Sequence, residues 1–340
     1  MSKVLVTGAT GFIGYHLVQT LTERGCDTTC LIRKTSRVDQ IRHFGVRFVE
    51  GDLSNRESLT KPLHDVQVVY HLAGTTKALR RRDLYRTNET GVVELLEACR
   101  RLVNPPVVVL VSSLAAAGPM PAGRPILRTE KDPPRPVSFY GHSKRAGELA
   151  AEDRAGDIPI TVVRPAIVFG EWDRDCYLMF RPIRRWGIHL VPGYRRKYFS
   201  LIHAQDLVPL LLAAAERGER LPGPQDQDAA RGTGYYFAAG PDHPTYGQLG
   251  KMMGAALGRR VLVLPIAPPV VWLVAAVNTV VGRLTRRPKA LSLDKVREAL
   301  AGSWVCSSEK AERQLGFRVG ASLAERLKQT ADWYKTQGWL

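Results

Sequence analysis

The stretch KVLVTGATGFIG, residues 3–14, runs from an apolar, β-branched segment through three glycines into an amphipathic segment. Gly8, Gly11 and Gly14 fall where a chain must turn tightly and approach a ligand closely, which glycine permits. The free N–H groups and the positive dipole end of the helix that follows suit a phosphate group. Because strand, turn and helix come in this order, the stretch predicts a dinucleotide-binding unit.

The same alternation continues over the first 170 residues. Short β-branched runs predict strands at 3–7, 28–32, 47–50, 66–72, 107–112 and 160–164. Amphipathic stretches predict helices at 12–24, 83–102 and 140–154. Strands that alternate with helices are typical of a parallel sheet covered on both faces, so we predict an α/β fold with a Rossmann-type doubly wound sheet.

Beyond residue 170 the alternation becomes less regular. We expect residues 1–170 to form the dinucleotide-binding domain and residues 171–340 a smaller, interleaved C-terminal lobe that binds substrate. A helical pattern at 204–217 and a strand pattern at 234–238 suggest that segments 200–217 and 234–240 return to the first domain. Helices are also predicted at 245–257 and 323–337, and an exposed loop at 218–234.

The composition of the 340 residues, 44% hydrophobic and 24% charged, is that of an ordinary globular protein. The five cysteines are scattered and form no CxxC pair or metal-ligand spacing, so we expect reduced structural thiols and no metal site. The N-terminal MSKVLVTG starts on a strand pattern and lacks the features of a signal peptide. A cytoplasmic location is therefore expected.

The net charge of +17 raises the question of an anionic partner. The basic residues are dispersed and not interleaved with aromatic residues, so nucleic-acid binding is not expected. The apolar run at 261–284 is broken by prolines, and its uninterrupted part, 270–281, is shorter than the ~20 residues of a membrane span. It predicts a buried helix, although its basic flank at 283–289 leaves open a peripheral membrane contact through 261–289, and a homodimer also stays open.

A candidate catalytic pair lies in SFYGHSK, residues 138–144. Tyr140 and Lys144 are four positions apart, so they share one face of the predicted helix. A free tyrosine has a pKa near ~10, and a nearby ammonium stabilises the phenolate. Ser113 ends the predicted strand VVVLVSS, at the edge where open α/β sheets bind ligands. The three side chains suit proton exchange with an alcohol or a ketone.

The segment CLIRKTSR, residues 30–37, bears on the choice of dinucleotide. An acidic residue after the second strand accepts hydrogen bonds from the ribose of NAD, whereas a cation there favours the 2′-phosphate of NADP. Arg33 holds that position, with Lys34 and Arg37 close by. We predict a preference for NADP(H), with NAD(H) kept as the second choice and a solvated surface arginine as the alternative interpretation of Arg33.

Eight motifs occur together along the chain: TGATGFIG at 7–14, GDL at 51–53, HLAG at 71–74, Asn88, VSS at 111–113, YGHSK at 140–144, RPAIVFG at 164–170 and IHAQDL at 202–207. In this set and order the chain resembles the extended short-chain dehydrogenase/reductase family, also called the NAD-dependent epimerase/dehydratase superfamily. The resemblance covers almost the whole length. It implies an enzyme that uses a nicotinamide dinucleotide.

The resemblance also implies roles for particular residues. The catalytic set would be Ser113, Tyr140, Lys144 and Asn88, with Asn88 supporting the lysine through water. The residues implied to bind the cofactor are Gly8, Gly11, Phe12, Ile13, Gly14, Arg33, Asp52, Leu53, Ala73, Gly74, Tyr140, Lys144, Pro165 and Val168. Capping or surface exposure is the alternative for Asn88, strand termination is the alternative for Pro165, and His203 is expected to be structural.

Three functions remain in competition. The first is an NADP(H)-dependent oxidoreductase for a hydrophobic ketone or secondary alcohol, which is steroid-, lipid- or flavonoid-like. The C-terminal half favours it, because 303–317 resembles the hydroxysteroid dehydrogenase and dihydroflavonol reductase branches.

The second is a nucleotide-sugar epimerase or dehydratase with tightly bound NAD. Its usual tyrosine before the glycine of SSLAAAG is replaced by Ala117. The third is a regulator that binds the dinucleotide without catalysis, which would not need Ser113, Tyr140 and Lys144.

The substrate lobe offers apolar candidates for a pocket in Met179, Phe180, Trp186, Phe199 and 270–281, with the core of the lobe as an equal alternative. The basic loops at 181–185 and 194–198 are candidates for binding a substrate phosphate or a coenzyme A thioester, and the alternative is that they bind no ligand. The sequence predicts the reaction class better than it predicts the molecule.

Overall fold

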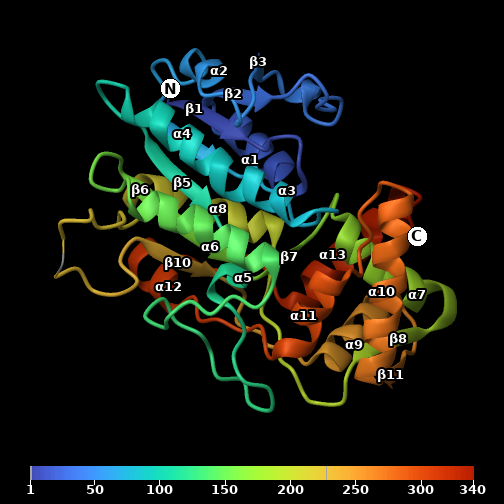
Figure 1. Cartoon of the computed structure of the whole chain (residues 1–340). Helices are drawn as coiled ribbons and strands as arrows, with labels where there is room; N and C mark the ends of the chain where they lie inside the picture. Colours follow the sequence, from blue (N-terminus) through green and yellow to red (C-terminus); the bar gives the residue numbers. More distant parts are fainter. Residues whose placement is uncertain (1, 227) are drawn as a thin grey trace.

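The computed structural model describes residues 2–226 and 228–340, and its centre is a seven-stranded sheet (Figure 1). The strand order is β10-β6-β5-β4-β1-β2-β3, and every neighbouring pair is parallel. This order, with the crossover beside β1, is that of the Rossmann fold, so the predicted fold class is confirmed. The strands are β1 (Lys3–Thr7), β2 (Asp27–Ile32), β3 (Arg47–Glu50), β4 (Val68–His71), β5 (Val107–Val111), β6 (Ile160–Pro165) and β10 (Tyr235–Ala238).

Helices cover both faces of the sheet because the strands are apolar on both sides. One face packs against α1 (Phe12–Glu23), α8 (Ala204–Arg217) and α12 (Glu309–Leu315). The other packs against α2 (Glu57–Thr60), α4 (Gly91–Arg100) and α6 (Phe139–Glu152). The predicted helix at 204–217 and the predicted strand near 234–238 thus lie against and within the main sheet.

The second half of the chain builds a lobe with a core of its own. That core contains Phe180 and Met253 and lies between α7 (Arg174–Trp186), α9 (Tyr246–Ala256) and α13 (Leu323–Thr336). Two small parallel sheets, β8–β11 and β7–β9, complete it. The remaining elements of this half are β7 (Ile167–Phe169), β8 (Ile188–Pro192), β9 (Leu201–His203), β11 (Leu262–Ile266), α10 (Pro268–Leu284) and α11 (Leu293–Ala301).

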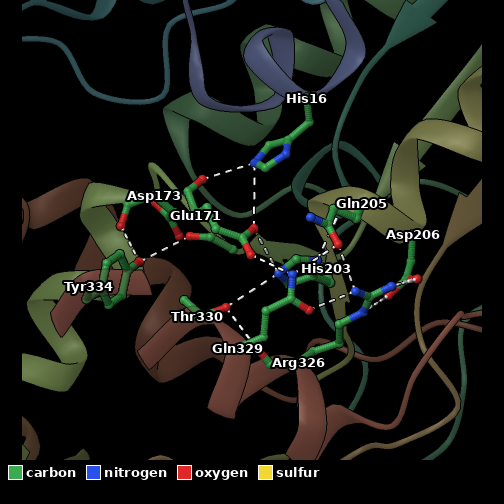
Figure 2. Close-up of polar contacts among 11 residues, drawn as sticks. His16, Glu171, Asp173, His203, Gln205, Asp206, Arg326, Gln329, Thr330 and Tyr334 are labelled. Carbon is green, nitrogen blue, oxygen red and sulfur yellow. Dashed lines mark hydrogen bonds and ion pairs between the residues drawn. The ribbon is translucent and has the colours of Figure 1, made fainter. Parts of the chain in front are cut away.

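A polar network joins helix α13 to the sheet domain (Figure 2). Glu171 lies at its centre, with its carbonyl oxygen 3.0 Å from His16 Nε2 and its carboxylate 3.3 Å from His203 Nε2. Arg326 of α13 donates from Nε to Asp206 of α8 at 2.9 Å. His203 therefore holds elements together and begins helix α8, which agrees with the structural role expected from the sequence.

A buried ion pair fixes helix α6 to the sheet. Arg164 at the end of β6 donates two hydrogen bonds, of 2.8 and 2.7 Å, to the Glu148 carboxylate of α6. Ser112, just after β5, donates a third to the same carboxylate. Both charged side chains are almost fully buried, and burial raises the pKa of Glu148 while Arg164 and Ser112 lower it to a net depressed value. The pair places α6 against β5 and β6.

The prediction of a buried helix at 270–281 is wrong in one respect. Helix α10 forms there, but only Val271, Ala275 and Gly282 of it are buried. The hydrophobic cluster beneath α10 is small, and Val296 of α11 is its only fully buried member from another element among the described residues. Most of the α10 surface therefore faces solvent. No helix in 2–226 or 228–340 is long and apolar enough to cross a bilayer.

The predicted helix at 83–102 is divided into three pieces. These are α3 (Arg81–Tyr85), a π-helical turn η2 (Arg86–Thr90) and α4. Such turns inside α-helices are frequent at functional sites, and this one contains Asn88. The short elements η1 (Arg42–Phe44) and α5 (Leu114–Ala117) were not predicted, nor were α7, α11, α12, β7, β8, β9 and β11 as separate elements. The five cysteines are free, as expected.

We predict that Arg164→Met destabilises the protein by about 3–5 kcal/mol, because it leaves the Glu148 carboxylate buried without its partner. The free energy of unfolding, measured by urea denaturation, checks this value. The double variant Glu148→Leu/Arg164→Met is the control. It should be more stable than Arg164→Met alone, and losses that simply add would show that the two charges do not form a pair.

Candidate active site

A cavity of about 410 Å³ opens at the carboxyl ends of β1, β2 and β4. Seven of the residues implied to bind the cofactor line it: Gly8, Gly11, Arg33, Asp52, Leu53, Ala73 and Gly74. Its floor requires glycine, because Gly8 has a φ of +74° and a Cβ there would lie 2.6 Å from the Ala73 nitrogen. Phe12, Ile13 and Gly14 form the first turn of α1, which begins at the cavity. The residues present therefore fit a dinucleotide whose phosphates lie at the start of α1.

One end of this cavity is polar and carries two arginines. Arg33 and Ser36 follow β2, and Arg86 reaches the same cavity from the π-helical turn η2. Hydrogen bonds from Ser54 depress the pKa of Asp52 most, and the charges of Arg33 and Arg86 add to this effect. Arg86 was missed from the sequence, where it is one arginine among many and only the fold brings it opposite Arg33.

The predicted catalytic side chains come together at the carboxyl end of β5. Ser113 follows this strand and caps α5, accepting a hydrogen bond of 3.1 Å from the Ala115 nitrogen. Tyr140 lies in the first turn of α6, near enough to Ser113 for the serine side chain to influence the pKa of the tyrosine hydroxyl. Lys144 follows one turn later on the same helix, so it shares a face with Tyr140.

Lys144 is buried and its ammonium donates to the Val111 carbonyl at 2.7 Å. Burial lowers its pKa to about 8, against the opposing charge of Glu148. Asn88 is also buried: its amide donates to Ser143 Oγ at 2.9 Å and its oxygen accepts from the Thr75 nitrogen at 2.9 Å. These contacts exclude the surface-exposed alternative for Asn88. They place it beside the helix turn that carries the lysine.

A second lysine that the sequence did not reveal lies over Tyr140, the predicted catalytic tyrosine. The ammonium of Lys295, in α11, is 4.6 Å from the centre of the Tyr140 ring and 2.8 Å from Glu298. Desolvation raises the pKa of Tyr140, while the charge of Lys295 and the hydrogen bond with Ser113 oppose that rise. Lys295 itself has a raised pKa in spite of burial, because Glu298 and Tyr140 favour its charged form. It therefore supplies a positive charge where a phenolate would form.

Helix α11 also holds the start of α6 in place. The Asp294 carboxylate accepts hydrogen bonds from the Phe139 and Tyr140 nitrogens at 2.7 and 3.1 Å. A carboxylate at a helix N-terminus is favourable for the helix dipole. Ser138, the N-cap of α6, donates to Glu298 at 2.5 Å. The C-terminal lobe thus orients the tyrosine of the other domain.

Pro165 and Val168 lie near this edge but outside the lining of the dinucleotide cavity. Val111 of β5 is in register with Val163 of β6, so Pro165 reaches the same level of the sheet as Ser113. Pro165 is buried and pairs with Ala238 of β10, while Val168 is half-buried in β7. Their contact with a nicotinamide stays a prediction.

Two further cavities involve the lobe. The larger, about 1010 Å³, lies between residues 76–84 and helices α10 and α11, and Lys295, which lies over the Tyr140 ring, is in its wall. The smaller, about 310 Å³, is lined by Phe199 and by the basic loop at 194–197. Of the apolar pocket candidates, Phe180 belongs to the core and Trp186 is exposed to solvent. In 2–226 and 228–340 no cluster of His, Cys, Asp or Glu could hold a metal ion.

The comparisons with known proteins agree with this geometry. The model of the NAD dependent epimerase/dehydratase family matches residues 4–228. The ceramide reductase of Caulobacter vibrioides is 30% identical over 99% of this chain and 96% of its own length. The sterol demethylase protein B of Methylococcus capsulatus is 27% identical over 98% of both chains. The structure of the Thermus thermophilus UDP-glucose 4-epimerase in complex with NAD superposes with a TM-score of 0.74 at 21% identity, covering 98% of this chain and 99% of that one.

The chain belongs to the NAD-dependent epimerase/dehydratase family, within the extended short-chain dehydrogenases/reductases. The resemblance seen in the sequence is thereby confirmed. The protein is an NAD(P)-dependent enzyme, and the comparisons support an oxidoreductase or an epimerase.

We predict that Lys295→Met raises the apparent pKa of the catalytic group by about one unit, because the phenolate of Tyr140 loses a stabilising charge. The pH dependence of kcat for alcohol oxidation checks this, and its acid limb should move to higher pH. An unchanged profile would mean that Lys295 has no electrostatic role.

Two controls accompany that measurement. Tyr140→Phe should abolish turnover at every pH with little change in cofactor affinity. Lys295→Arg keeps the charge and should restore most of the wild-type profile.

Proposed function

We propose that this protein is an NADP(H)-dependent oxidoreductase that interconverts a hydrophobic ketone and the corresponding secondary alcohol. The observation that carries the proposal is the Tyr140 side chain, which lies near Ser113, has the Lys295 ammonium 4.6 Å from the centre of its ring, and has Lys144 one helical turn away. A module that only bound the dinucleotide would have no need for such a set. The site is therefore that of an enzyme that moves a proton to or from an oxygen atom.

Each side chain has a distinct task in this proposal. Tyr140 donates a proton to the substrate oxygen in reduction and accepts it in oxidation. Ser113 orients that oxygen through its hydroxyl group. Lys144 holds the ribose next to the reacting ring, and Asn88 keeps the helix turn at Ser143 in position. When bound, the nicotinamide supplies the hydride or accepts it.

We propose a lipid-like substrate, with residues 171–340 as the lobe that binds it. Two relatives, named ceramide reductase and sterol demethylase protein B, have names that refer to lipids. The cavity of about 1010 Å³ beside Tyr140 is large enough for part of a long chain. Steroid-like and flavonoid-like ketones stay as further candidates, and the cytoplasmic location stays a prediction.

A nucleotide-sugar epimerase is the second candidate, because the fold is shared with a UDP-glucose 4-epimerase. Epimerases of this family carry out their reaction with a retained cofactor. The two arginines at the polar end of the dinucleotide cavity favour instead an extra phosphate, as in NADP, which is the form that reductases consume. The buried Ala117 also lacks the hydroxyl that the sugar-active branches carry at this position.

We predict that Arg33→Asp weakens NADP(H) binding about 10- to 100-fold, because one charge-assisted contact with the 2′-phosphate is lost. Binding of NAD(H) should stay the same or improve, since the new carboxylate accepts from the ribose. Fluorescence titration with NADPH and NADH checks both values.

The matched control is Arg42→Asp, the same change of charge outside the lining of the cavity. It should leave both affinities nearly unchanged. Equal affinity of the wild-type protein for NADP(H) and NAD(H) would contradict the cofactor preference.

The function itself is tested with NADPH and long-chain 3-ketones or 3-ketoamides in detergent micelles. We expect ketone-dependent oxidation of NADPH and one equivalent of alcohol per NADPH, with no turnover in Tyr140→Phe. Interconversion of UDP-sugars without net consumption of a dinucleotide would instead establish the epimerase.

A further inference from the structure

Helix α10 presents to solvent a face made only of apolar side chains. Its members are Val270, Leu273, Val274, Val277, Val280, Val281 and Leu284, which are between 37% and 78% exposed. Their spacing of three and four residues places them in one stripe along the helix. On a surface helix this stripe would ordinarily be polar. Its apolar character therefore calls for a partner.

The opposite side of α10 already has its contacts within the lobe. Val271 and Ala275 are buried against α11, and Thr279 on the same side accepts a hydrogen bond of 3.3 Å from the Leu293 nitrogen of α11. The packing of α10 within the lobe therefore does not involve the apolar stripe. In Figure 1, α10 runs along the outer side of the C-terminal lobe, away from the seven-stranded sheet.

The charge around this helix is of one sign. No Asp or Glu occurs from residue 243 to 293, whereas seven Lys and Arg residues do. Four of them, Arg283, Arg286, Arg287 and Lys289, follow each other at the C-terminal end of the stripe. A helix with an apolar face and a basic end is suited to the interface of an anionic bilayer. A second copy of the chain would bring a like-charged segment against this one, which is unfavourable.

Two exposed indole side chains lie in the same lobe. Trp272 of α10 is 38% exposed, and Trp186, at the end of α7, is 63% exposed. Tryptophan is enriched where a protein meets the headgroup region of a membrane. The small sheet that leads into α10 adds exposed leucines at Leu190, Leu262 and Leu264.

The cavity beside the catalytic tyrosine reaches this helix. Its wall includes Thr279, Arg283 and Arg286 on the α10 side and Phe139 and Lys295 on the Tyr140 side. Seven of its lining residues are basic and two are acidic. The cavity wall between the end of α10 and Lys295 is therefore mostly positively charged.

We propose that the exposed apolar face of α10 lies in the surface of an anionic lipid bilayer, with Arg283, Arg286, Arg287 and Lys289 against the lipid phosphates. The helix does not span the bilayer, and it brings the mouth of the large cavity to the lipid surface. The proposed membrane contact does not rest on the identity of the substrate, so it holds even if the reaction differs from the one proposed above.

The test is co-sedimentation of the full chain with phosphatidylcholine vesicles, with and without phosphatidylglycerol. We expect binding only to vesicles that contain phosphatidylglycerol, and weaker binding as salt screens the basic residues. Val277→Glu should weaken binding at least tenfold, and Leu273→Glu should do the same.

The matched control is Val103→Glu, because Val103 is 97% exposed in the loop after α4 and belongs to no part of this face. It should bind vesicles like the wild type. NADPH affinity and thermal unfolding show that each variant is folded.

Three outcomes would overturn the proposal. One is binding that Val277→Glu does not weaken, which would mean attraction by net charge alone. Another is a dimer that fails to bind vesicles and that Val277→Glu dissociates, which would make the face an interface between copies. The last is a monomer that binds no vesicle at all.

Discussion

The position of helix α6 depends on one buried ion pair, Glu148 with Arg164. It joins α6 to the end of β6, and through Ser112 it also joins α6 to the end of β5. The guanidinium lies 4.1 Å from the centre of the Tyr235 ring, so a neighbouring strand of the sheet also contacts it. Burying two charges is costly unless each has its partners, and here every oxygen of the carboxylate is bonded. Because the ion pair fixes α6 against the ends of β5 and β6, it sets the position of Tyr140 on α6 relative to Ser113 after β5.

The lobe contributes a second constraint from the other side. Asp294 and Glu298 of α11 bond the first turn of α6, and Lys295 lies over the tyrosine ring. Part of the electrostatic environment of Tyr140 therefore belongs to the C-terminal lobe. Movement of α11 would change both the cap of α6 and the charge near Tyr140.

Much of the fold and of the site was predictable from local patterns. The glycine turn, the apolar strands and the Tyr140–Lys144 spacing are features of short segments, and each was found in its predicted element. Arg86 and Lys295 could not be found in this way. Each is a single cation in a basic chain, and only long-range packing brings it to Arg33 or Tyr140. For α10 the apolar pattern predicted a helix correctly, but the pattern is the same for a helix in a core and for one at a surface.

The central claim is that the dinucleotide is a consumed cosubstrate. Native mass spectrometry of the freshly purified protein, followed by denaturation and identification of the released dinucleotide, tests it most directly. We predict an empty site, or NADP(H) that is lost on dialysis and can be replaced. Stoichiometric NAD that survives dialysis would contradict the claim and would indicate a cofactor that is reduced and reoxidised within one turnover.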